Sequence, residues 1–133
     1  MKEVTVGIDI GGTGTKIGVV DADAKILSQS KIKTPDYPEV DDFVKALAKE
    51  VKENLDKVKD PYKLKGIGIG APNGNFYKGT IEFAPNLPWK GFVPLVEKIK
   101  VHFDIPIVMT NDANAAAMGE MIYGKAKGLK DFI

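Results

Sequence analysis

A turn rich in glycine and threonine, directly after an apolar strand, constrains this chain more than any other feature. Residues 4–10 read V-T-V-G-I-D-I, the alternation of a β-strand, and their Val and Ile content suits the middle of a sheet. A carboxylate, Asp9, precedes the segment G-G-T-G-T-K at 11–16. Glycine permits positive φ and removes the Cβ atom, so successive N–H groups can cradle an anion. The pattern predicts a phosphate-binding turn and is equally typical of a tight hairpin into a strand at 15–20.

The rest of the chain predicts a mixed α/β domain. Three antiparallel strands come first, and strands and helices alternate after them, which is typical of a mixed five-stranded sheet with helices on both faces. Asp41 or Asp42 is the expected N-cap of the first helix, and the segment 76–89 is expected to be irregular. The expected strands are 4–10, 15–20, 25–34, 64–70 and 105–109, and the expected helices are 41–59, 91–103 and 111–123.

Three loops are expected to meet at one edge of this sheet, because ligands of such sheets bind at the carboxyl ends of strands. The loops are Asp9 to Thr13, Gly70 to Asn75 and Thr110 to Asp112. An aspartate that opens a helix, as Asp112 would, is ordinarily an N-cap. Its expected place at the same edge as Asp9 favours a functional role, since two carboxylates beside one cleft can serve a metal-phosphate and an acceptor hydroxyl.

Other candidates carry weaker signals. Trp89 is expected to pack against its own segment, although stacking on a sugar is an alternative. His102 is expected at the surface. The P-loop spacing is absent, and so is G-x-G-x-x-G, because Asn73 stands where the last glycine of that motif would be.

Composition excludes several classes of function. A chain of 133 residues with 44% hydrophobic residues suits one domain with a core. The net charge of +1 gives no field for steering onto nucleic acid or a membrane, so neither partner is expected. Cysteine is absent, no apolar run approaches the ~18 residues of a membrane span, and the first strand leaves no room for a signal peptide. A cytoplasmic location is expected.

Four motifs occur together in this chain. They are G-I-D-I-G-G-T-G-T-K at 7–16, G-I-G-A-P-N-G-N at 68–75, A-P-N-L-P-W at 84–89 and N-D-A-N-A-A-A-M-G-E at 111–120. In this order and spacing they resemble the ROK family of sugar kinases, in particular its bacterial glucokinases. The first motif also suits other members of the sugar kinase, Hsp70 and actin superfamily, whereas the last is more specific. The resemblance implies the ribonuclease H-like fold of the actin/hexokinase superfamily.

The resemblance also implies roles for individual residues. The loop facing the phosphates of ATP and Mg²⁺ would comprise Asp9, Gly11, Gly12, Thr13 and Lys16, with Asp9 holding Mg²⁺ through phosphate or water. The sugar would be bound by Asn111, Asn73, Gly74 and Asn86, with Asp112 as the catalytic base. The family more often has glycine after the proline of the second motif and an acidic residue further on. The sequence Pro72-Asn73-Gly74-Asn75 departs from that pattern, so the identity of the sugar stays open.

The implied reaction is transfer of the ATP γ-phosphoryl group to a hexose, with the 6-OH of glucose as the first choice. A carboxylate of pKa ~3.9 does not deprotonate a free alcohol. Asp112 would instead orient the hydroxyl and accept its proton as the bond to phosphorus forms, which suits a loose transition state.

The family has two domains, and the second carries another phosphate loop and most of the adenosine site. Residues 1–126 are therefore expected to be the N-terminal domain and 127–133 the start of the second. The chain alone is expected to be inactive, and the full-length protein is expected to be a homodimer. Two alternatives are a superfamily ATPase without a sugar acceptor and a family regulator, which would carry a helix-turn-helix before the first strand.

Overall fold

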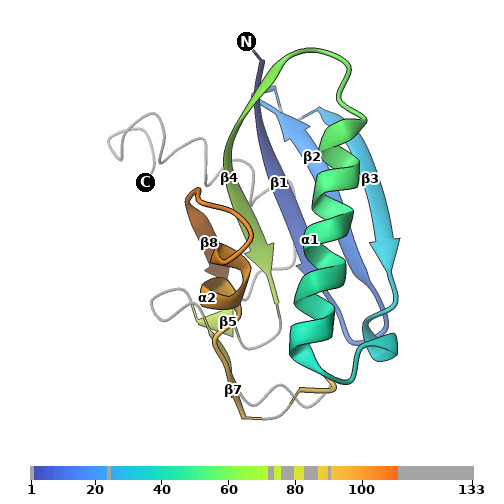
Figure 1. Ribbon diagram of the computed structural model, residues 1–133, viewed down its shortest axis with the longest axis vertical. Helices are drawn as coiled ribbons and strands as arrows, with labels where there is room; N and C mark the ends of the chain where they lie inside the picture. The colour runs from blue at the N-terminus through green and yellow to red at the C-terminus, as the bar shows by residue number, and fades with distance from the viewer. Residues whose placement is uncertain are drawn as a thin grey trace.

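The computed structural model describes residues 2–23, 25–71, 74–75, 80–82, 87–89 and 91–110. Five strands form the main sheet in the order β3-β2-β1-β4-β8 (Figure 1). These strands are β1 (Lys2–Ile10), β2 (Thr15–Asp21), β3 (Ile26–Ile32), β4 (Tyr62–Gly70) and β8 (Ile107–Thr110). The helices are the 3₁₀ turn η1 (Thr34–Asp36), α1 (Val40–Asp56) and α2 (Leu95–Lys100). The predicted mixed five-stranded sheet is confirmed.

The directions of the strands also match the prediction. β1 pairs with β2, and β2 with β3, in antiparallel register, whereas β1 pairs with β4, and β4 with β8, in parallel register. β1 therefore lies in the middle of the sheet, as its run of Val and Ile indicated. β3 is shorter than the predicted strand 25–34, because η1 turns the chain at Thr34-Pro35-Asp36.

The main core lies between the sheet and α1. Val6, Ile8 and Ile10 of β1 are almost completely buried, because alternate residues of a strand point to the same face. The apolar stripe of α1, centred on Leu47 and Val51, packs against this face. α2 contacts both α1 and β8, so α1 and α2 cover the same face of the sheet (Figure 1). The third predicted helix, 111–123, lies outside the described residues.

Three short strands were not predicted. β5 (Gly74–Asn75), β6 (Thr80–Glu82) and β7 (Phe92–Val93) pair in antiparallel register as a second sheet. Strands this short contain no readable alternation, so the sequence suggested an irregular segment. β7 also replaces the start of the predicted helix 91–103, and α2 begins only after Pro94, which is its N-cap.

The predicted N-cap of α1 is wrong. Glu39 occupies that position and makes no side-chain cap hydrogen bond. Asp41 and Asp42 lie in the first turn of the helix, where a carboxylate is stabilised by the helix dipole. Asp41 also accepts a 2.7 Å hydrogen bond from Nζ of Lys98, which joins the start of α1 to α2.

No helix in the described part of the chain is long and apolar enough to cross a membrane.

Candidate functional site

The topology places three strand ends side by side. Asp9 of β1 pairs in register with Gly70 of β4, and Gly70 pairs with Thr110 of β8. All three strands are parallel, so their carboxyl ends form one edge of the sheet. The predicted convergence is therefore confirmed for the ends of these strands. The segment after β1 is the glycine-rich turn, and the segment after β8 begins with the Asn-Asp pair of the sequence.

The glycine-rich segment is the turn of the β1–β2 hairpin. The last residue pair of the hairpin is Ile10 and Thr15, and the N–H of Gly11 donates a 3.0 Å hydrogen bond to the carbonyl of Gly14. The hairpin interpretation is confirmed. The turn lies at the edge formed by the carboxyl ends of β1, β4 and β8. The phosphate interpretation therefore stays equally open, because one turn can both join two strands and bind a phosphate.

Of the two expected reasons for glycine in this turn, a positive φ does not apply. Among the described glycines only Gly91, outside the turn, has a positive φ, of 70°. Lack of space is the actual constraint at Gly11, where a Cβ atom would lie 3.0 Å from the carbonyl oxygen of Gly14. A side chain at this position would require the carbonyl of Gly14 to shift by a few tenths of an ångström, so glycine suits the compact shape of the turn.

Asp9 lies at the carboxyl end of β1, directly opposite Lys16 of β2. Burial raises the pKa of the Asp9 carboxyl above its ordinary value, and the positive charge of Lys16 partly opposes this shift. A partly buried carboxylate at the carboxyl end of a strand is a suitable partner for a cation. The family resemblance implies such a role for Asp9, which stays a prediction.

The two threonines of the turn region have different environments. Thr13 is exposed, so its hydroxyl is accessible to a ligand. Thr15 is fully buried, and its hydroxyl is hydrogen-bonded at 2.8 Å to the hydroxyl of Thr34. Thr15 therefore belongs to the core face of β2, and Thr13 is the threonine that suits a phosphate.

The donor set at this edge suits a magnesium ion that a nucleotide carries with it. Mg²⁺ is usually bound by one or two carboxylates together with substrate phosphates and water, rather than by a cage of protein ligands. Asp9 supplies one such carboxylate. Within the described ranges no group of three or more His, Cys, Asp or Glu side chains could hold a metal by itself. The residues present therefore fit Mg²⁺ bound through phosphate or water.

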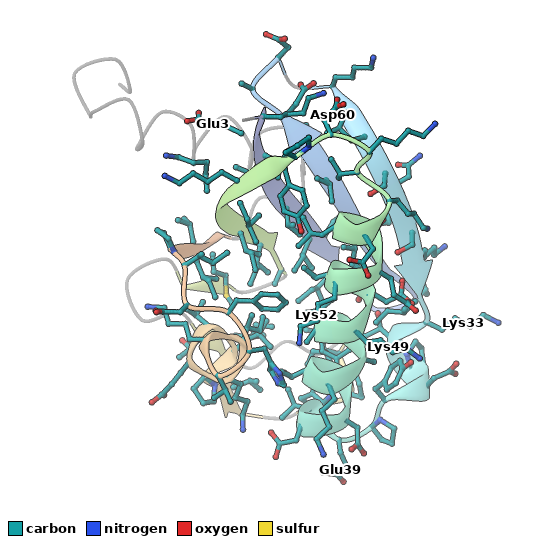
Figure 2. All side chains as sticks on the ribbon, turned by 45° about the horizontal axis from the view of Figure 1, so that its top comes forward. Glu3, Lys33, Glu39, Lys49, Lys52 and Asp60 are labelled. Atoms are coloured by element: carbon teal, nitrogen blue, oxygen red, sulfur yellow. The ribbon has the colours of Figure 1, made fainter. Side chains whose placement is uncertain are left out.

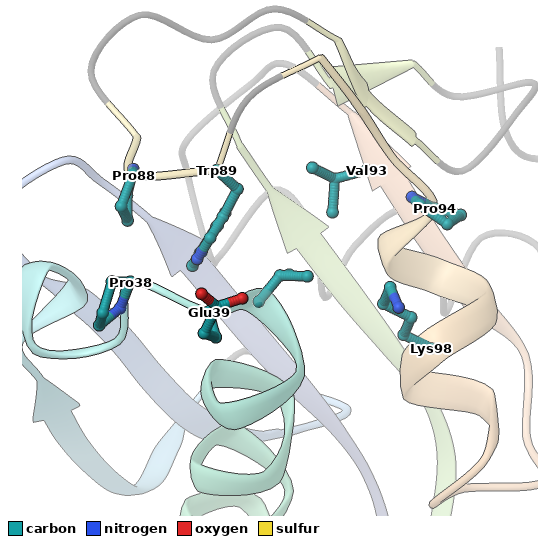
Figure 3. Close-up of a pocket in the computed structure, with 8 residues that line it drawn as sticks. Pro38, Glu39, Pro88, Trp89, Val93, Pro94 and Lys98 are labelled. Carbon is teal, nitrogen blue, oxygen red and sulfur yellow. The ribbon is translucent and has the colours of Figure 1, made fainter.

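Trp89 is buried, as a packing role requires, but its described contacts are with residues of other segments and not with its own. Its ring lies 4.5 Å from the ring of Phe43 between centroids, and its Nε1–H donates a 3.0 Å hydrogen bond to the carbonyl of Tyr37. Only 5% of the residue is exposed. A groove of about 420 Å³ passes beside it, between the start of α1 and the start of α2 (Figure 3). Because its ring is covered and its N–H is bonded, Trp89 is not free to stack on a sugar.

The structure describes some of the remaining predicted site residues, and others lie outside the described residues. Gly74 lies in β5, where it pairs with Ile81 of β6. The side chains of Lys16 and Thr13 are exposed at the turn. Four predicted ligands and catalytic residues lie outside the described residues: Asn73, Asn86, Asn111 and Asp112.

Sequence reasoning missed one residue at the turn. Lys31 of β3 pairs with Lys16 of β2, and the end of its side chain lies against Gly14. A lysine in an alternating strand carries no signal of its own. Its position could have been inferred only by aligning the three N-terminal strands in register.

Comparisons with a family profile, with known sequences and with solved structures all match this chain to ROK family proteins. The sequence profile of the ROK family matches residues 5–133. Glucokinase of Streptomyces coelicolor A3(2) is 40% identical over 131 residues, which cover 98% of this chain and 39% of that protein. The crystal structure of a ROK family glucokinase from Streptomyces griseus in complex with glucose and AMPPNP matches with a TM-score of 0.66 and 37% identity, covering 94% of this chain and 38% of that chain.

A regulator is also among the relatives. The xylose repressor of Caldicellulosiruptor bescii is 41% identical over 75 residues, which cover 55% of this chain and 18% of that protein. The chain thus spans well under half of the length of each of these relatives.

Proposed function

The chain belongs to the ROK family, and we propose that it is the N-terminal part of an ATP-dependent hexose kinase of that family. One observation carries the proposal: the glycine turn beside Asp9 and the strand end before Asn111 and Asp112 lie at the same edge of the sheet. A phosphate-binding turn and an acceptor-binding pair are the two parts that a phosphoryl transfer requires. The likeness to glucokinase along nearly the whole chain supports the same function.

In the proposed reaction the turn from Gly11 to Thr13 binds the phosphates of ATP through the hydroxyl of Thr13 and through N–H groups other than that of Gly11, which is bonded to the carbonyl of Gly14. Lys16 supplies a positive charge beside it. Mg²⁺, carried by the nucleotide near Asp9, would neutralise phosphate charge. Asp112 accepts the proton of a hexose hydroxyl as its oxygen forms a bond to the γ-phosphorus and the bond to the leaving ADP breaks. Positioning and charge neutralisation supply most of the catalysis in such a reaction.

Glucose is the proposed acceptor, since the two relatives described above that match nearly all of the chain are both glucokinases. Asn111 would bind the sugar together with Asn73, Gly74 and Asn86. Residues 1–126 would form the first domain and 127–133 the start of a second, as the two-domain organisation of the family implies. The full-length protein would be a homodimer. It would be located in the cytoplasm, where ATP is available.

A phosphorylation assay of the full-length protein tests this function. ADP release would be followed with glucose, mannose, N-acetylmannosamine, fructose and allose, and without sugar. We expect release that depends on a hexose, fastest with glucose, and a loss of at least about 100-fold in kcat for Asp112→Asn. Release that is independent of sugar would indicate an ATPase instead. Full activity of Asp112→Asn would mean that Asp112 is only a helix cap.

A family regulator is the second candidate, favoured by the likeness to the xylose repressor over 75 residues. It would bind a sugar without transferring phosphate. Calorimetric binding of a hexose by a full-length protein that shows no ADP release would favour it over the kinase. The likeness to the repressor covers 55% of the chain against 98% for the glucokinase, which is why the kinase is proposed first.

A further inference from the structure

The end of the Lys31 side chain fills the space above Gly14. A Cβ atom built on Gly14 would collide with Cε of Lys31 and would lie 3.3 Å from its Nζ. The nearest backbone atom, the carbonyl oxygen of Ile32, would be at an ordinary distance of 3.6 Å. With glycine at position 14 the flexible end of the Lys31 side chain can lie over the turn, and it brings an ammonium group there; a Cβ atom would displace it.

Lys31 belongs to a row of charged residues that crosses three strands. Asp9 pairs with Lys16, and Lys16 pairs with Lys31, and residues directly opposite each other in antiparallel strands share a face. Both lysines are exposed, on the face opposite to the buried Ile17 of β2. The row therefore places two ammonium groups and one carboxylate beside the glycine turn.

The charges of this row do not balance. Like charges directly opposite each other in a sheet are destabilising. Within the described part of the chain, neither Lys16 nor Lys31 has a carboxylate within salt-bridge distance. Two adjacent cations without such a partner, next to a turn that carries the exposed Thr13, suit an anion with several charges better than they suit an empty surface.

We propose that Lys31 binds the triphosphate of the nucleotide together with Lys16. It would be the second lysine beside the glycine turn that contacts the phosphates. This inference rests on the proposed function, since it concerns the same site. It also gives Gly14 a role distinct from that of Gly11: Gly14 keeps the space through which the ammonium of Lys31 reaches the turn. Lys31 contributes to the binding of the nucleotide and not to the binding of the sugar.

The test compares Lys31→Met with Lys33→Met in the full-length protein. Lys33 is also an exposed lysine, but it lies just after β3 and its side chain points away from the molecule (Figure 2). We expect Lys31→Met to raise the KM for ATP and the Kd for AMPPNP about tenfold, with kcat and the KM for glucose nearly unchanged. Lys33→Met should leave all four values unchanged. Equal effects of the two variants would overturn the inference.

A double-mutant cycle tests the link between Lys31 and Gly14. Gly14→Ala displaces the Lys31 side chain, so it should weaken AMPPNP binding in the wild-type background. In a Lys31→Ala background the same substitution should cost little, because the space is already empty. Additive effects of Gly14→Ala and Lys31→Ala would overturn the proposed coupling.

The design separates this inference from the proposed function. If the wild-type protein binds AMPPNP but phosphorylates no hexose, the proposed kinase function is wrong, and the comparison of Kd values for Lys31→Met and Lys33→Met still decides the role of Lys31. If the wild-type protein binds no nucleotide, the inference itself is overturned.

Discussion

The hydroxyls of Thr15 and Thr34 are hydrogen-bonded at 2.8 Å, and both residues are fully buried. Thr15 is the first residue of β2 after the glycine turn, and Thr34 begins η1. The bond therefore fixes the base of the turn to the chain segment that leads from β3 to α1.

Thr34→Val should destabilise the chain by about 1–3 kcal/mol, because it leaves the hydroxyl of Thr15 buried without a partner. The double variant Thr15→Val/Thr34→Val should lose less than the sum of the single variants, since neither hydroxyl then remains unsatisfied. Urea denaturation measures all three free energies of unfolding. Thr13→Val, at an exposed position of the same turn, should change stability by at most about 0.5 kcal/mol. Additive losses would show that the two hydroxyls do not interact.

Asn54 joins α1 to the edge strand β3. Its Nδ2 donates to the hydroxyl of Ser30 at 2.7 Å and to the carbonyl of Glu50 at 2.9 Å, and the residue is fully buried. Asn54→Leu should cost about 1–3 kcal/mol of stability, because it removes these bonds and puts a branched apolar group among polar atoms. Lys49→Ala, at an exposed position of the same helix, is the control and should be nearly neutral. Equal stabilities of the two variants, measured by urea denaturation, would contradict the role of Asn54.

Trp89 is predicted to anchor its segment by both its ring and its N–H. Trp89→Phe keeps an aromatic ring next to Phe43 but loses the hydrogen bond to the carbonyl of Tyr37, so it should cost about 1–3 kcal/mol. Trp89→Ala should cost about 3–5 kcal/mol, since it also leaves a cavity. Circular dichroism during thermal or urea unfolding gives both values. An equal loss for the two variants would mean that the ring itself contributes nothing.

The titration of Asp9 should reflect its burial. We expect NMR titration of the carboxyl carbon to give a pKa above the ordinary value for aspartate, and Lys16→Met to raise that pKa further. A carboxyl with a raised pKa in the folded state favours unfolding when it is ionised. Above the folded pKa, Asp9→Asn should therefore be at least as stable as the wild type, and this advantage should disappear as the pH falls to the unfolded pKa. A pKa below the ordinary value would contradict the burial argument.

Asp41 should titrate in the opposite direction. The hydrogen bond and the charge of Lys98 lower the pKa of the Asp41 carboxyl, so Lys98→Met should return it towards the ordinary value. The contribution of this pair to stability is present above the unfolded pKa and is lost as the pH falls through the lower folded pKa. The same NMR experiment as for Asp9 measures it. A pKa of Asp41 that does not respond to Lys98→Met would rule out the pair in solution.

The sequence predicted the elements that have a long apolar period. The alternation from Val4 to Ile10 extends over most of β1, and the apolar stripe extends over several turns of α1. The sequence alone therefore indicated which residues of these elements are buried. β5, β6 and β7 have two or three residues each and were missed for that reason. The N-cap was misplaced because an aspartate serves equally well at the cap and in the first turn.

The candidate site was predictable only in part. The order of residues along β1, β4 and β8 indicated which loops follow strand ends, and the parallel register confirmed that these ends are neighbours. The position of Lys31 depends on its pairing with a residue of β2. The alternation of polar and apolar residues in a strand shows on which side of the sheet a residue lies, but it does not show which residue of the next strand pairs with it. The buried hydroxyl of Thr15 was likewise hidden, because its partner Thr34 belongs to a distant segment.

The central place of β1 has a consequence for how the chain is made. β1 can pair with β2 as soon as the hairpin is synthesised, but its other edge waits for β4, which ends at Gly70. At about 5–20 residues per second, translation leaves that edge open for several seconds. An open, apolar strand edge is a template for association with other chains. The open edge of β1 is thus exposed to such association until β4 pairs with it, and the carboxyl ends of β1 and β4 become neighbours only then.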